Sequence, residues 1–194
     1  MTDRPAARSG TPTWAKVLAG CCLVALGLAV MFLVGVCTLV DTARSARVRA
    51  YELTAVNHLR AYVRGQEEYR ALKGRYAPKM MQLVSDKGAG GEKLELIPFG
   101  LAATGEGSRA EYGAYRFREV KTIAGRPVDW QKQFGLSAVP AGKVEGVAGT
   151  RAFIVDQSGA IWSRSCSEGA GFVEDFPADP AAAGWTSVGT AGEH

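Results

Sequence analysis

Residues 14–74 contain no proline, and this run constrains the fold of the chain more than any other feature. The first part of the run, Val17–Val40, contains no charged residue. A helix rises about 1.5 Å per residue, so an apolar helix of this length crosses a hydrocarbon core of about 30 Å with modest tilt. We therefore predict a transmembrane helix over residues 14–41.

The proline-free run continues beyond Asp41 as an amphipathic helix. Neither proline nor glycine occurs between Asp41 and Gly65, so nothing local ends the helix at the membrane surface. Apolar residues recur at spacings of three and four, which indicates one apolar helical face. These residues are Val48, Ala55, Val56, Leu59, Tyr62, Val63, Tyr69 and Leu72. We predict a stem helix over residues 42–74, continuous with the transmembrane helix, whose apolar face packs against the downstream chain.

The N-terminal segment before the apolar run is short and polar. Residues 1–13 contain two prolines and show no apolar periodicity, which is typical of a disordered leader. A cleaved secretory signal has a shorter apolar core and a cleavage site of small residues, whereas this run is long and ends in Val40 and Asp41. The tetrapeptide Leu18–Cys21 spells a bacterial lipobox, but a lipobox closes an apolar stretch and this one opens it. We expect the segment to be retained as a single-pass anchor.

The distribution of charge leaves the orientation of this anchor open. The positive-inside rule compares the basic residues on the two sides of a membrane span, and here the two sides are equal. They are Arg4, Arg8 and Lys16 before the span, and Arg44, Arg47 and Arg49 after it. The net charge is +4, and no lysine and arginine cluster interleaved with aromatic residues indicates a nucleic-acid partner.

The sequence after the stem predicts a helix end followed by irregular structure. Gly74 can adopt the left-handed conformation of a helix cap, and Pro78 prevents the helix from resuming nearby. A brief helical turn is expected over Met80–Val84. The glycine-rich segment Ser85–Glu92 lacks the Lys-Ser/Thr ending of a phosphate-binding loop, and we expect an ordinary loop there.

The second half of the chain changes from helical to strand periodicity. Tyr112–Val120 alternates, with Tyr115, Phe117 and Glu119 on one face and arginines on the other.

A hairpin is predicted further along the chain. Two β-rich runs, Ala152–Val155 and Ala160–Trp162, flank the turn-forming residues Asp156–Gly159. Val139–Thr150 contains proline and several glycines, so we expect an irregular connection there.

Together these patterns predict an α+β fold, in which the long N-terminal helix packs against a small antiparallel sheet of about three or four strands within residues 75–194. The tail from Glu168 is rich in proline, glycine and alanine, and we expect it to wrap the domain. The stem residues expected beneath the sheet are Leu59, Tyr62, Val63 and Tyr69, and the aromatic residues expected to hold the tail are Phe172, Phe176 and Trp185.

The order of these segments resembles type IV pilins and the pseudopilins of type II secretion. The resemblance rests on the apolar span, on Val56–Arg60 and on Glu67–Tyr76. In that superfamily the helix ends in a tyrosine, which is followed by a glycine and a Tyr-Pro or Tyr-Ala pair. The chain then enters a periplasmic sheet. Thr150–Trp162 and the tail Asp179–Trp185, together with Tyr115-Arg116-Phe117, resemble pilin-like bacterial proteins of unassigned function. The resemblance covers residues 17–186.

The resemblance implies an architecture and a place in the cell. It implies an inner-membrane protein with a single span and a C-terminal domain in the periplasm or outside the cell. The implied partners are the lipid bilayer, secretion or pilus subunits, and a second copy of the chain. Pilins also share a glycine before the mature N-terminus and a glutamate five places into the helix, and Val17–Val40 contains no glutamate. Processing and filament assembly are therefore not implied here.

From these observations we expect a non-enzymatic, minor pseudopilin-like component or accessory. The alternative is a free-standing envelope sensor or ligand-binding domain on a single-span tether. The only histidines are His58 and His194, and His58 has no cysteine, serine or aspartate at triad or metal spacing, so we expect a solvated helix position. Three other cysteines lie in the apolar run, which leaves Cys166 without a disulfide partner in the domain, and we expect a plain thiol.

The remaining candidates for chemistry are carboxylates. Glu174, Asp175 and Asp179 cluster in the tail, and related pseudopilins can hold calcium with loop oxygens. The three residues lack the regular spacing of a calcium loop. They are candidate calcium ligands, and a solvated acidic loop is the alternative; no other cofactor is expected.

Overall fold

The computed structural model describes the backbone of residues 13–105, 111–142, 149–166 and 171–190. The side chains of residues 13–26, 29, 34, 36, 37 and 190 lie outside the described residues, and so does most of the predicted leader. Much of the predicted span Val17–Val40 therefore falls outside them. In the part of the chain that the structure describes, no helix combines the length and apolar character needed to cross a membrane.

The described residues form three helices and eight strands. In chain order they are α1 (Thr13–Lys73), α2 (Gln82–Ser85), α3 (Phe99–Thr104), β1 (Tyr115–Glu119), β2 (Thr122–Ile123), β3 (Arg126–Pro127), β4 (Gly135–Pro140), β5 (Arg151–Asp156), β6 (Ala160–Ser165), β7 (Asp175–Phe176) and β8 (Thr186–Thr190). An antiparallel sheet combined with a long helix gives the α+β class that the sequence predicts.

Helix α1 is a single helix of 61 residues that runs through Asp41 without interruption. It ends as predicted, because Gly74 has a left-handed φ of 72° and its N–H donates to the carbonyl of Arg70. The chain divides into two units, Met1–Ser45 and Ala46–His194. The division falls within α1, so the part of the stem after Ser45 belongs to the same unit as the sheet.

The larger sheet has five antiparallel strands in the order β1-β4-β5-β6-β8. The predicted hairpin is confirmed as β5 and β6, with Ile154 opposite Trp162 and a left-handed φ of 72° at Gly159 in the turn. Strand β1 is confirmed as well, with Tyr115 and Phe117 buried as the alternation requires. The described sheet exceeds the expected three or four strands because β4 and β8 were not predicted.

Strand β4 corrects the expectation of an irregular connection from Val139 onward. All residues of Gly135–Pro140 are buried, and β4 lies between β1 and β5. A strand covered on both faces shows no alternation of apolar and polar residues, so periodicity does not reveal it. Residues 143–148 of the expected connection lie outside the described residues.

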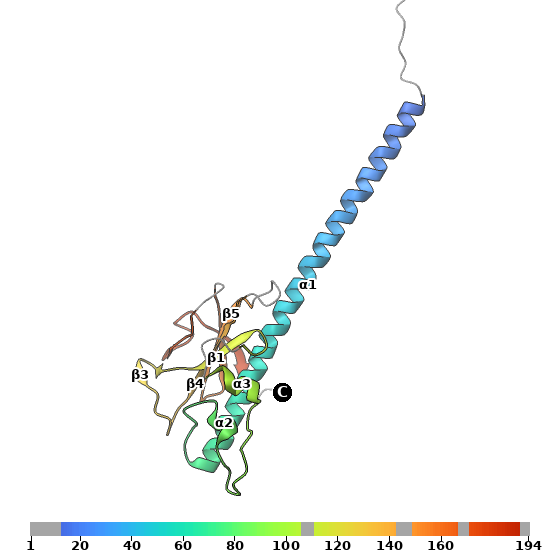
Figure 1. Ribbon diagram of the computed structural model, residues 1–194. Coiled ribbons are helices and arrows are strands. Elements are labelled where there is room, and N and C mark those ends of the chain that lie inside the picture. Colours follow the sequence, from blue (N-terminus) through green and yellow to red (C-terminus); the bar gives the residue numbers. More distant parts are fainter. Residues whose placement is uncertain (1–12, 106–110, 143–148, 167–170, 191–194) are drawn as a thin grey trace, which may run out of the picture. The chain divides into compact units, whose positions relative to one another are not determined.

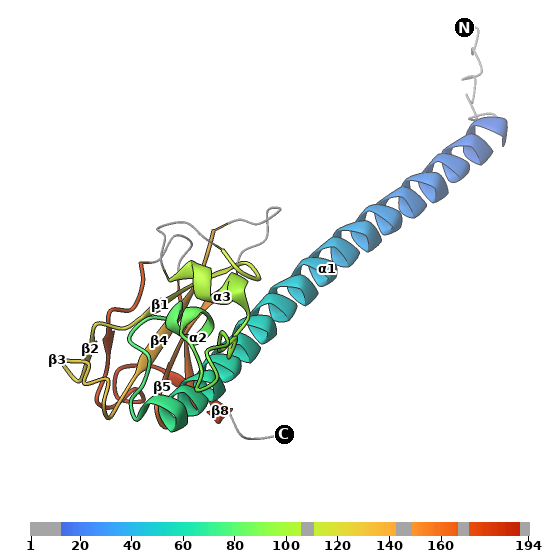
Figure 2. The same ribbon diagram turned by 60° about the horizontal axis from the view of Figure 1, so that its bottom comes forward.

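The main core forms between α1 and the inner face of the sheet. Leu59, Tyr62, Val63 and Tyr69 are buried there, as predicted. The prediction that Leu72 belongs to the packed face of the stem is wrong, since Leu72 is 52% exposed. At about 100° per residue, position 72 lies about 60° beyond Tyr69 around the helix, outside the arc that faces the strands. In the two ribbon views, this part of α1 lies beside the strands (Figures 1 and 2).

A second core forms on the opposite face of the sheet, where the tail covers it. Phe176 and Trp185 are buried there, as predicted, and Phe172 is half-buried beneath the Arg118 guanidinium, 4.0 Å from its ring centroid. The other buried residues in this core are Val120, which follows β1, and Val139, Ala152 and Ile154 of β4 and β5. The tail also contributes β8 and, through β7, completes a small sheet in the order β3-β2-β7.

Candidate functional site

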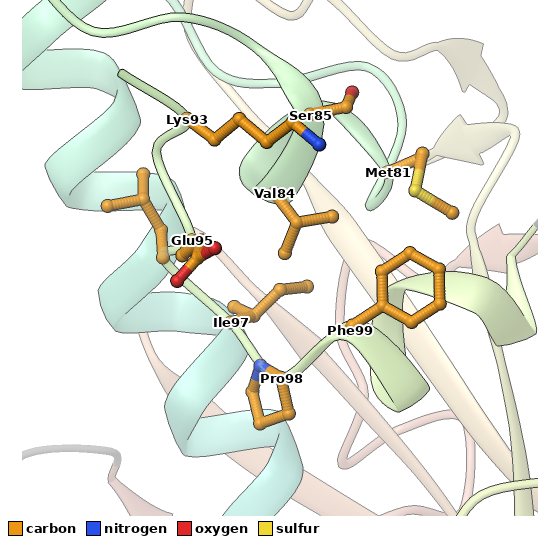
Figure 3. A pocket seen from close by; sticks show the side chains of 9 residues that line it. Met81, Val84, Ser85, Lys93, Glu95, Ile97, Pro98 and Phe99 are labelled. Carbon is orange, nitrogen blue, oxygen red and sulfur yellow. The ribbon is translucent and has the colours of Figure 1, made fainter.

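An open groove lies between α2, the extended segment before α3, and α3 itself. Its volume is about 580 Å³. Most of its surface is apolar, and Phe99, at the start of α3, is 69% exposed. Figure 3 shows Val84, Ile97 and Phe99 around one space, with Lys93 along its rim. The full lining is Met81, Val84, Ser85, Lys93, Glu95, Leu96, Ile97, Pro98 and Phe99.

Backbone contacts hold the extended segment that forms one wall of this Phe99 groove. The Leu96 N–H donates to the carbonyl of Leu83 in α2, and the Leu94 N–H donates to the carbonyl of Asp86. Gly65 of α1 lets the segment approach closely, since a Cβ at this position would lie 2.7 Å from Cγ2 of Ile97. Within the segment, Glu95 has a left-handed φ of 46°, a conformation that strains a residue with a side chain.

A second, smaller cavity of about 270 Å³ shares Met81 with the Phe99 groove. Its other lining residues are Lys79, Met80, Gly105 and Glu119. Glu119 is the last residue of β1 and lies in phase with the buried Tyr115 and Phe117. The sequence pattern placed Glu119 on this inward face, but it was not recognised as a candidate site residue.

The Glu119 carboxylate occupies an unfavourable environment for a charge. Burial raises the pKa of Glu119, against the opposing effects of a hydrogen bond from the Met80 N–H to Oε1 and of the Lys79 and Arg118 charges. Glu119 forms no ion pair with any described residue. Its charge in turn raises the pKa of the buried Tyr62 hydroxyl, whose own burial has the larger effect.

His58 is not the solvated residue that the sequence predicted. Its ring packs on Tyr112, with the centroids 4.5 Å apart, and meets the edge of Phe117 at 5.7 Å. Burial lowers the pKa of His58. The buried Nδ1 has no hydrogen-bond partner among the described residues. No local pattern indicates this packing, because Tyr112 and Phe117 are more than fifty positions away from His58 along the chain.

Cys166 is a half-buried free thiol. Burial and the Glu52 charge raise the pKa of Cys166, and the smaller effect of Arg164 opposes them. A raised thiol pKa disfavours the nucleophilic thiolate. The other cysteine side chains and His194 lie outside the described residues.

The three tail carboxylates proposed as calcium ligands each have a separate protein partner. Glu174 pairs with the Lys121 ammonium at 2.6 Å, which lowers the pKa of Glu174. Asp175 accepts from the Thr122 hydroxyl and the Gly125 N–H, and Asp179 accepts from the Ala182 N–H. The described residues contain no group of three or more acidic, histidine or cysteine side chains placed to hold a metal ion. Calcium binding in this loop stays a prediction.

Comparison of the chain with models of protein families, with curated proteins and with solved structures finds no match.

Proposed function

We propose that this chain is a membrane-anchored, pilin-like protein of the bacterial envelope, and that it serves as a minor pseudopilin-like component or accessory of a secretion or pilus apparatus. The supporting observation is the course of α1. The helix Thr13–Lys73 contains the apolar run and has no break at Asp41, and its buried residues from Ala55 to Tyr69 belong to the core with the antiparallel sheet. That arrangement agrees with the architecture that the resemblance to pilins implies.

The proposed anchor is the apolar run Val17–Val40, placed as a single span of the inner membrane, with Ala46–His194 in the periplasm or outside the cell. Among its described side chains, Leu28, Met31 and Phe32 are 65%, 75% and 74% exposed. Apolar surface of this kind, left uncovered by the chain itself, suits contact with lipid or with other apolar helices. A second copy of the chain is a proposed partner for the same surface.

We propose a non-enzymatic role for the folded unit. His58 lies between aromatic rings, and the Cys166 thiol has a raised pKa, so the surroundings of both residues favour structural roles over proton transfer or nucleophilic attack.

The Phe99 groove favours a second candidate function, a single-span envelope sensor or ligand-binding domain. Its volume of about 580 Å³ lies within the range of small-molecule sites. Under this alternative the helix serves only as a tether.

Anchoring and orientation can be tested with reporters fused after His194. We expect alkaline phosphatase to be active there and green fluorescent protein to be dark; the opposite pattern would refute the proposed topology. Substituting Leu28→Lys and Phe32→Lys together places two charges in the apolar run and should release the protein from membranes at alkaline pH. The matched control is Leu53→Lys, at an exposed position of α1 beyond the run, which should leave the protein in the membrane fraction.

The two candidate functions can be separated by what binds the protein. Cross-linking in living cells followed by purification should recover secretion or pilus subunits if the first proposal holds. A small ligand that raises the melting temperature, with no such subunits recovered, would favour the sensor.

A further inference from the structure

Glu119 is a carboxylate that has hydrogen-bond donors around it but, in the part of the chain that the structure describes, no opposite charge in contact with it. It accepts from the Met80 N–H and from its own backbone N–H, and the neutral amide of a glutamine could also accept these bonds. The charge is held on the inward face of β1, where burial disfavours it, and it has no ion-pair partner among the described residues. A half-buried charge that lines a cavity is typical of a functional position.

Gly105 forms the part of the cavity wall against which the Glu119 carboxylate lies. A Cβ at Gly105 would lie 3.3 Å from Oε1 and 3.5 Å from Oε2 of Glu119, and 2.9 Å from Cε of Met80. Gly105 has φ −72° and ψ −24°, a conformation that any residue adopts. The backbone therefore does not require glycine here, and its small size leaves room for the Met80 methyl group and the Glu119 carboxylate at the wall of the cavity.

The chemistry of this cavity selects a cation. A carboxylate offers about four acceptor sites, and the N–H groups of Met80 and of Glu119 itself use two of them. An ammonium or guanidinium group entering the cavity would supply donors and the missing opposite charge. Lys79 lies at the cavity but forms no ion pair with Glu119 in the described structure.

The Phe99 groove adds a second requirement. It shares Met81 with the Glu119 cavity, so the two spaces are neighbours and one ligand can contact both of them. Val84, Ile97 and the exposed Phe99 ring offer an apolar surface. The ligand should therefore carry a large apolar group next to its cationic group, as adjacent side chains of a peptide do.

We propose that the Glu119 cavity and the Phe99 groove together bind a peptide segment of a partner protein, with a lysine or arginine side chain entering the cavity and a neighbouring large apolar side chain lying in the groove. All the residues involved belong to Ala46–His194, so the inference does not depend on the proposed anchor. If the peptide did not bind, the results of the reporter fusions and of the membrane extraction would be unchanged.

The test uses the full-length protein in phosphatidylcholine nanodiscs and an acetylated, amidated pentapeptide of sequence Gly-Phe-Arg-Phe-Gly, with binding measured by calorimetry. The matched probe replaces arginine by citrulline, which has nearly the same shape without the charge. We expect roughly 10- to 30-fold weaker binding of the arginine peptide to Glu119→Gln than to the unchanged protein, and a similar loss for the citrulline peptide. Phe99→Ala should also weaken binding, because it removes an exposed apolar surface.

Glu174→Gln is the control, since it removes an exposed carboxylate outside both the cavity and the groove, and binding should not change. Circular dichroism and the melting temperature show whether each variant is folded. Equal binding to the unchanged protein and to a folded Glu119→Gln variant would overturn the proposal. Equal binding of the two peptides would do the same. Glu119-dependent binding of butylamine without any binding of the peptide would overturn the peptide partner and identify a small amine instead.

Discussion

Gln66 is the buried polar residue that joins the end of α1 to the chain that leaves it. Its side chain is fully buried, and it makes three hydrogen bonds. Nε2 donates to the Tyr62 hydroxyl at 2.8 Å and to the Ala77 carbonyl at 2.9 Å, and Oε1 accepts from the Ala77 N–H at 2.8 Å. The side chain therefore serves both backbone groups of Ala77, a residue that is itself fully buried.

We expect Gln66→Ala to lower the free energy of unfolding by about 3–5 kcal/mol. A typical hydrogen bond contributes a net of about 1 kcal/mol, so the loss of three gives about 3 kcal/mol. The same loss can be counted by the groups left behind: the Ala77 N–H, the Ala77 carbonyl and the Tyr62 hydroxyl would be buried without partners at about 1–3 kcal/mol each, which sums to about 3–9 kcal/mol. Partial relaxation of the structure and entry of water keep the loss in unfolding free energy in the lower part of this range.

The measurement is urea unfolding of the full chain in detergent micelles, followed by tryptophan fluorescence. The matched control is Glu68→Ala, an exposed substitution two positions along α1 that should change the free energy of unfolding by less than about 0.5 kcal/mol. If Gln66→Ala costs no more than Glu68→Ala, the hydrogen bonds at Ala77 do not hold the end of α1 to the domain, and the reasoning is refuted.

Three further predictions concern single residues. Because the folded-state pKa of His58 is below 6.5, the protein should lose stability as the pH falls from 6.5 through that folded value. The melting temperature of His58→Phe should not show this loss. Parallel curves of melting temperature against pH for the two proteins would contradict the prediction. Because the folded-state pKa of Glu119 is above 4.5, the unchanged protein should lose stability as the pH rises from 4.5 through that folded value. Urea unfolding should show that Glu119→Gln gains stability relative to the unchanged protein over the same pH range. A difference in unfolding free energy that stays constant with pH would count against burial as the cause of the raised pKa. Gly74→Ala should cost about 1–2 kcal/mol through its left-handed φ alone, since nothing lies near its Cβ position, whereas Gly171→Ala, also in open space, should be nearly neutral in the same unfolding assay.

Local patterns sufficed where a segment has one apolar face and one polar face. The stem was predictable because its buried residues lie within one arc of the helix, and β1 was predictable because Tyr115 and Phe117 alternate with arginines. The hairpin of β5 and β6 followed from turn chemistry that ends in Gly159. In each case a pattern among neighbouring residues reports directly on one local conformation.

The segments that were not predicted depend on contacts between distant parts of the chain. Every residue of β4 is buried because β1 and β5 flank it while the two cores cover its faces, so its burial carries no periodic signal. Strand β8 lies in a tail whose composition is typical of loops, and it forms by pairing with β6. His58 was misplaced for the same reason, since the rings that enclose it arrive from β1 and the residues just before it.

The candidate site differs from these cases because a local signal was present. The alternation that buries Tyr115 and Phe117 puts Glu119 in phase with them, at the end of the same strand. A side chain placed by strand periodicity on an apolar face while carrying a charge is a local conflict, since burial disfavours the charged form. Such a conflict is resolved by an internal ion pair, by protonation, or by a group that binds from outside. No ion pair with a described residue resolves it here, and the carboxylate lines a cavity. If Glu119 were held protonated instead, the stability gained by Glu119→Gln would keep increasing as the pH rises above 4.5, while the affinity for a cationic peptide would not change. That pair of results would exclude an external partner.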